Sequence, residues 1–121
     1  MKKLKFNNTY SSGAVTYLIF KEKAQFVGVC LEFDLVVKAP TFKETEKQIE
    51  DYAYAWLENV VDYHLPETLL NKPAPKKYWR IYERARLEEE TRKKQANINN
   101  SSIFPVAHSF QPYSPQFPLF A

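Results

Sequence analysis

The sequence predicts an α+β protein in which one long helix covers a three-stranded antiparallel sheet, followed by a second C-terminal helix and an irregular tail. Two apolar runs, residues 15–20 and 26–31, are separated by a short charged segment of hairpin length. A brief acidic break leads to a third run at 35–38, and apolar residues then recur at helical spacing over 41–63. Stacking the helix on the sheet buries both apolar surfaces.

The three strands should pair as neighbours because the connections between them are short. Pro40 lacks a backbone donor and should end the third strand. Since both faces of the second strand are apolar or small, we expect one to pack under the helix and the other against a partner chain. The two faces are formed by Val27, Val29 and Leu31 and by Phe26, Gly28 and Cys30.

The long helix should begin at Thr41, because Thr41 and Glu44 have the spacing of a capping box. The Thr41 hydroxyl would accept a hydrogen bond from an amide of the first turn, and the Glu44 carboxylate would accept one from the Thr41 amide. At roughly 30 Å, the helix is long enough to cross a three-stranded sheet. Its predicted buried face consists of Ile49, Tyr52, Ala53, Trp56, Leu57 and Val60.

Changes of composition divide the chain into a sheet-and-helix domain (residues 1–75), a charged amphipathic helix (76–96) and a Pro- and Phe-rich tail (97–121). The tail has no charged residue and four prolines, so we expect it to be irregular or disordered. The alternative is that its aromatic side chains dock in a groove of this chain or of a second protomer. These side chains are Phe104, Phe110, Tyr113, Phe117 and Phe120.

Composition limits the chemistry. At 121 residues and 45% apolar content, the chain is long enough for one modest core. A single cysteine excludes an internal disulfide, and no apolar run has the length of a signal peptide or a membrane span, so we expect a cytoplasmic protein with no membrane partner. Two glycines are too few for a phosphate-binding loop.

Neither a cofactor, a metal site nor a catalytic residue is expected. His64 and His108 are isolated from each other, and Cys30 lies in an apolar strand, where a buried core thiol is the usual role. Glu32 and Asp34 could hold a divalent ion for nuclease chemistry, but turns favour Asp for conformational reasons, and no further carboxylate converges on them. The sequence therefore favours a protein that is not an enzyme.

The second helix carries the one basic cluster of the chain. Residues 76–95 contain eight Lys or Arg against four acids. With the interleaved aromatics, this cluster could follow a nucleic-acid backbone. The alternative, which we favour, is a solvated helix whose aromatics pack on the domain, because acids from Glu83 onward dilute the charge. The basic side chains are Lys76, Lys77, Arg80, Arg84 and Arg86.

The order of these features resembles the HicB-like antitoxin family. Its members carry a hairpin, a Cys-Leu-Glu-Leu-Asp-like segment, a third strand and a Thr-x-x-Glu-Ala helix start. Here the corresponding segments are Cys-Leu-Glu-Phe-Asp at 30–34 and Thr-Phe-Lys-Glu-Thr at 41–45, and the resemblance covers about residues 16–63. It implies a β-β-β-α domain of partial ribonuclease H-like fold without the nuclease site, usually dimeric.

In that family the domain binds and blocks a small HicA-type toxin that cleaves messenger RNA, and a C-terminal module often binds operator DNA. Residues 76–121 match neither a helix-turn-helix nor a ribbon-helix-helix, so operator binding is not carried over. The resemblance implies an antitoxin-type homodimer. The alternatives are a nucleic-acid-binding accessory protein that uses residues 76–86 and a stand-alone HicB-like domain with another binding role. Partner-binding residues are expected around the acidic turn: Phe26, Glu32, Phe33 and Asp34.

Overall fold

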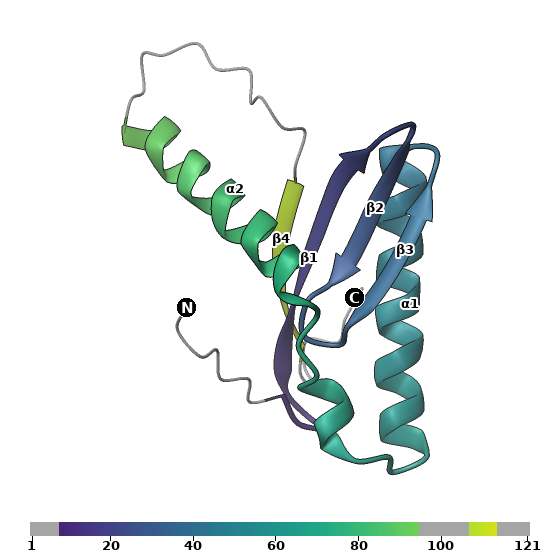
Figure 1. Ribbon diagram of the computed structural model, residues 1–121. Helices are drawn as coiled ribbons and strands as arrows, with labels where there is room; N and C mark the ends of the chain where they lie inside the picture. The colour runs from purple at the N-terminus through teal and green to yellow at the C-terminus, as the bar shows by residue number, and fades with distance from the viewer. Residues whose placement is uncertain (1–7, 95–106, 114–121) are drawn as a thin grey trace.

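A computed structural model describes residues 8–94 and 107–113. The described strands form one antiparallel sheet in the order β3-β2-β1-β4, and two helices accompany it (Figure 1). The predicted α+β class is confirmed, but the predicted number of three strands is wrong. The elements are β1 (Gly13–Glu22), β2 (Gln25–Cys30), β3 (Leu35–Ala39), α1 (Phe42–Asp62), the 3-10 helix η1 (Glu67–Leu70), α2 (Lys76–Lys94) and β4 (Ala107–Tyr113).

The fourth strand comes from the segment that we expected to be irregular. β4 pairs antiparallel with β1, from Gly13 opposite Tyr113 to Ile19 opposite Ala107. The central residues of β1 are buried, so their backbone groups need hydrogen-bond partners on both edges of the strand. β2 supplies one set of partners and β4 the other. Pro112 is tolerated because β4 is an edge strand, where one side of the backbone has no ladder partner.

Helix α1 packs on one face of the sheet, mainly against β2 and β3 and less against β1 (Figure 1). It therefore lies over one side of the sheet, whereas we expected it to cross the whole of it. The Thr41 hydroxyl accepts a hydrogen bond from the Glu44 amide at 3.1 Å, as predicted. The Glu44 carboxylate accepts a hydrogen bond from the same hydroxyl at 3.1 Å, where we expected the Thr41 amide as donor.

The opposite face of the sheet is covered by the chain itself, where we expected a partner chain. Ala74 and Trp79 pack against the buried side chains of Leu18, Val27 and Val29. This segment is held by backbone hydrogen bonds from the Lys72 and Ala74 amides to the carbonyls of Glu32 and Leu31, at 2.8 and 2.9 Å. The start of α2 is thereby fixed to the sheet, and the C-terminal end of the helix projects beyond it (Figure 1).

Gly28 determines how closely α1 approaches β2. A Cβ atom on Gly28 would lie 2.8 Å from Cγ2 of Thr45 and 3.2 Å from Cβ of Ile49. The Thr45 side chain is fully buried, and its hydroxyl donates a hydrogen bond to the Thr41 carbonyl at 2.8 Å, which fixes the methyl group above Gly28. The Thr45 side chain fits at this close approach because position 28 has no side chain.

We expect Gly28→Ala to lower the free energy of unfolding by about 1–3 kcal/mol, because the new methyl group overpacks this contact. Thr45→Ser removes Cγ2 and keeps the hydroxyl, so the double variant should lose less stability than the two single variants together. Denaturant unfolding of the four proteins measures this coupling. If the losses of unfolding free energy of the two single variants simply add in the double variant, the proposed contact between positions 28 and 45 is contradicted.

Candidate functional site

The acidic turn between β2 and β3 lies largely inside the protein. Glu32 is only 6% exposed. One of its carboxylate oxygens accepts a hydrogen bond from the Thr16 amide at 2.6 Å, and the other accepts one from the Thr16 hydroxyl at 2.7 Å. The Leu31 amide donates to the Thr16 carbonyl at 3.0 Å. Both oxygens of Glu32 therefore connect the turn to β1, which is a structural use of the carboxylate.

Burial controls the electrostatics around this turn. Burial raises the pKa of Glu32, and the hydrogen bonds from Thr16 oppose that shift without cancelling it. Burial, followed by the charge of Glu32, raises the pKa of the Cys30 thiol. A protonated and fully buried thiol is a poor nucleophile, so the environment of Cys30 favours the core role. Tyr17 is also buried, and its hydroxyl has no hydrogen-bond partner among the described residues.

The four residues predicted to bind a partner do not form one surface. The side chains of Glu32 and Phe33 are buried. Phe26 is half-buried at the start of β2, where its ring meets the ring of Phe42 edge-on at 6.0 Å. Asp34 lies at the other end of the hairpin, with a left-handed backbone (φ 57°) and its carboxylate 3.7 Å from Nζ of Lys72. Phe26 and Asp34 thus remain partly accessible, but far apart along the hairpin.

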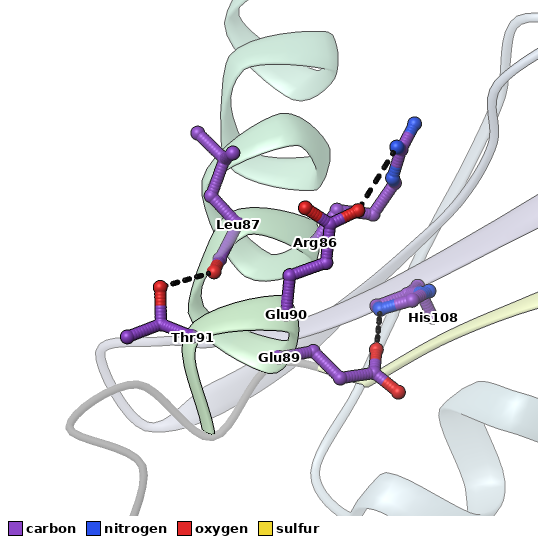
Figure 2. A network of polar contacts seen from close by, with 6 residues as sticks. All are labelled: Arg86, Leu87, Glu89, Glu90, Thr91 and His108. Atoms are coloured by element: carbon purple, nitrogen blue, oxygen red, sulfur yellow. Dashed lines mark hydrogen bonds and ion pairs between the residues drawn. The ribbon is translucent and has the colours of Figure 1, made fainter. Parts of the chain in front are cut away.

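Helix α2 buries one aromatic ring, Trp79, while its basic side chains are exposed, and two of them lie over the rings of Tyr78 and Tyr82. Trp79 is buried against the sheet, and Tyr78 and Tyr82 pack beside it. This arrangement agrees with the amphipathic interpretation that we favoured and leaves the buried Trp79 ring unavailable for base stacking. Arg86 pairs with Glu90 at 3.6 Å (Figure 2). The five basic side chains are all exposed: Lys76, Lys77, Arg80, Arg84 and Arg86.

Strand β4 is attached to the rest of the chain at both ends. His108 Nε2 lies 2.7 Å from a carboxylate oxygen of Glu89 on α2, as Figure 2 shows, and the imidazole meets the Tyr82 ring edge-on at 5.5 Å. At the other end Tyr113 is buried, and its hydroxyl donates to the Thr9 carbonyl at 3.0 Å. One aromatic residue of the tail therefore docks in the core of its own chain.

Of the other tail aromatics, the structure describes only Phe110. Phe110 is 67% exposed on β4. Phe104, Phe117 and Phe120 lie outside the described residues. The attachment of β4 by His108 was missed because nothing in the sequence links an isolated histidine to a glutamate 19 positions away.

Helix α1 carries a surface that the sequence did not reveal. Tyr52 was assigned to the buried face, but it is 43% exposed. It belongs to a row of exposed residues that recur every three or four positions and carry no charge, although the rest of the helix surface is highly charged. We call this row the uncharged stripe. It consists of Gln48, Tyr52, Ala55, Asn59 and Tyr63.

Over residues 8–94 and 107–113, no three His, Cys, Asp or Glu side chains are grouped so that they could hold a metal ion. Within the same part of the chain, the helices are too short or too polar to span a membrane. Comparisons with protein-family models, with curated proteins and with solved structures find no match for this chain.

The Glu32 carboxylate should make stability depend on pH. Because its pKa is raised above the ordinary 4.5, the folded state holds the proton more tightly than the unfolded state. The free energy of unfolding should therefore fall as pH rises from about 4.5 through the raised pKa, and the whole cost of the buried charge is present above it. Glu32→Gln should remove this part of the pH dependence, as measured by denaturant unfolding between pH 4 and 8.

Two further variants make this measurement specific. Glu32→Ala leaves the buried Thr16 amide without its partner and should cost about 1–3 kcal/mol at pH 7. Glu58→Gln, which changes an exposed carboxylate on α1, should leave the pH profile unchanged. If the stability of Glu32→Gln depends on pH in the same way as that of the unaltered protein, the buried carboxylate is not the source of the pH dependence.

Proposed function

We propose that this chain is a non-enzymatic, HicB-like binding protein of antitoxin type, which sequesters a small HicA-like toxin that cleaves messenger RNA. The observation that carries the proposal is the internal use of the acidic turn. Both oxygens of Glu32 accept hydrogen bonds from Thr16, and Cys30 is buried beside it. Glu32 and Cys30, the residues of the HicB-like segment that could carry chemistry, thus support the fold. The outer surface of the segment remains available for binding. Such a partnership would operate in the cytoplasm.

Helix α1 supplies a surface that suits a toxin of this kind. It contains six acidic residues against two lysines, and most of the acids are exposed. A ribonuclease that binds RNA needs a basic surface for the phosphate backbone. An acidic helix is complementary to that surface, so it would speed association and compete with RNA. The acids are Glu44, Glu46, Glu50, Asp51, Glu58 and Asp62.

A second candidate function is nucleic-acid binding by α2. The observation that favours it is the exposure of all five basic side chains in the first half of the helix, with a single acid, Glu83, among them. With Trp79 buried, its ring cannot stack on bases, so such binding would depend mainly on phosphate contacts. The third possibility is a stand-alone HicB-like domain that binds another protein partner. Like the antitoxin, it would use the surface of α1 for binding.

Co-expression with the small open reading frame beside this gene tests the antitoxin function. We expect the protein to restore growth to cells that express the toxin and to co-purify with it. Glu58→Lys combined with Asp62→Lys should weaken the complex about tenfold, because two attractive charges become repulsive. Glu83→Lys, an exposed reversal on α2, serves as the control and should leave affinity unchanged. Absence of both rescue and co-purification would exclude the antitoxin function.

Fluorescence anisotropy with a labelled oligonucleotide tests the second candidate. If α2 contacts phosphates, binding should weaken steeply with salt, and Lys76→Ala, Arg80→Ala and Arg84→Ala should each lower the salt slope by about 1. Lys43→Ala on α1 is the control. No binding at low salt, or binding that survives all three substitutions together, would exclude this function.

A further inference from the structure

Strand β4 carries an exposed aromatic ring on the face of the sheet where helix α2 lies. Phe110 pairs with Thr16 of β1, and His108 pairs with Leu18. Leu18 packs under Trp79 of α2, so the side chains of His108 and Phe110 lie on the α2 side of the sheet. Phe110 is 67% exposed there. A single exposed ring is ordinary on a protein surface, and Phe110 is distinguished by the basic helix beside it.

Phe110 is held at a fixed position beside α2. His108, two residues before it, lies about 7 Å away along the strand. The imidazole of His108 contacts Glu89 of α2 at 2.7 Å (Figure 2) and the ring of Tyr82 at 5.5 Å. The guanidinium of Arg86 lies over the same Tyr82 ring, 5.9 Å from its centroid. The contact between Tyr82 and His108 therefore joins a basic side chain of α2 to the strand that carries the exposed ring.

The basic flank of α2 is on the Phe110 side of the helix. Tyr78 marks the opposite flank, because its ring contacts the ring of Phe20 with centroids 6.1 Å apart. Phe20 is four residues further along β1 than Thr16, the partner of Phe110. Two residues on either side of Tyr78, the exposed Lys76 and Arg80 lie nearly opposite to it around the helix, at about 160°.

The basic half of α2 is the half that lies on the sheet, where Trp79 is buried. Residues 76–86 contain five bases and one acid, which gives a net charge of +4, whereas residues 88–94 contain three of each and have no net charge. The C-terminal end of the helix is the part that projects beyond the sheet (Figure 1). A helix that reads duplex DNA must protrude far enough to enter the major groove. The basic half of α2 does not protrude in this way.

A single strand makes a different demand on the protein. It needs a positively charged surface for its phosphates and an aromatic ring beside it, because its unpaired bases are free to stack. The basic flank of α2 provides the charge, and Phe110 provides the ring. Charge and exposure together therefore favour a single strand over a duplex.

We propose that single-stranded nucleic acid binds across α2 and β4, with its phosphates along Lys76, Arg80 and Arg86 and one base stacked on the ring of Phe110. This inference rests on the second candidate function, nucleic-acid binding by α2, and names its substrate class. The stacked base is recognised by its flat π-face, so the site accepts many sequences. The site is on the opposite face of the sheet from α1 and does not use the acids proposed to bind a toxin.

Fluorescence anisotropy of the full chain with three labelled probes tests the site. The probes are an oligothymidine of about 16 nucleotides, its duplex with oligoadenosine, and an abasic strand of the same length that keeps the phosphates and has no bases. We expect the oligothymidine to bind about tenfold more tightly than the abasic strand, because only the oligothymidine can stack on Phe110.

Substitutions at Phe110 separate stacking from general apolar contact. Phe110→Ala should weaken oligothymidine binding about tenfold and leave binding of the abasic strand and the duplex unchanged. Phe110→Leu keeps an apolar side chain without a flat ring, so it should behave like Phe110→Ala. Phe110→Trp should retain tight binding, and its added indole fluorescence should be quenched by the oligothymidine and not by the abasic strand. Tyr63→Ala, at a 73% exposed ring on α1, is the control and should leave all three affinities unchanged.

Salt separates the phosphate contacts from the stacked base. Phe110→Ala should lower the affinity for oligothymidine by the same factor at every salt concentration, because stacking releases no counterions. Arg80→Ala should instead lower the salt slope by about 1 for all three probes.

Equal affinities for the oligothymidine and the abasic strand would overturn the proposal, and so would an oligothymidine affinity that is unchanged in Phe110→Ala. If that binding is still lost when Lys76, Arg80 and Arg84 are replaced together, the second candidate function stands and the Phe110 site alone is excluded. Absence of binding to every probe at low salt excludes both. The growth-rescue assay is independent of these results, because Phe110→Ala leaves the acids of α1 in place.

Discussion

Strand β1 is buried on both faces and paired along both edges, and this constraint places every other described element. Its apolar residues Val15, Tyr17 and Leu18 point alternately toward the two faces of the sheet. One face is packed under α1 and the other under Ala74 and the start of α2. Its two edges pair with β2 and β4. A strand of this composition is stable only when all four sides are covered, because burial then removes both apolar surface and backbone groups from water.

The contact between Glu32 and Thr16 shows how a polar group is accommodated in that core. Burying an ionised carboxylate costs free energy, and the same loss of hydration raises the pKa of Glu32. The two short hydrogen bonds from Thr16 offset part of it and hold the β2–β3 turn at one position on β1. The neighbouring Lys72 and Ala74 amides bind the carbonyls of the same turn, so the start of α2 depends on the position of that turn.

Three chemically distinct surfaces surround this core. The acids of α1, the uncharged stripe beside them and the basic residues of α2 do not overlap, because helical periodicity and the buried faces keep them apart. The proposed functions use two of these surfaces separately: the acids of α1 for a basic toxin and the basic residues of α2 for phosphates.

The sequence by itself determined the elements whose signals are local: two hairpin-connected strand pairs, the helix capped by Thr41 and the start of α2 near Lys76. Only the tertiary structure decided β4, because the pairing of Gly13 with Tyr113 joins residues 100 positions apart and the prolines of the tail hide its strand. It also decided that Glu32 and Phe33 are inside and Tyr52 outside. Alternation and periodicity say which side chains share a face, but burial depends on what packs against that face, and here the covering segments are distant in the sequence.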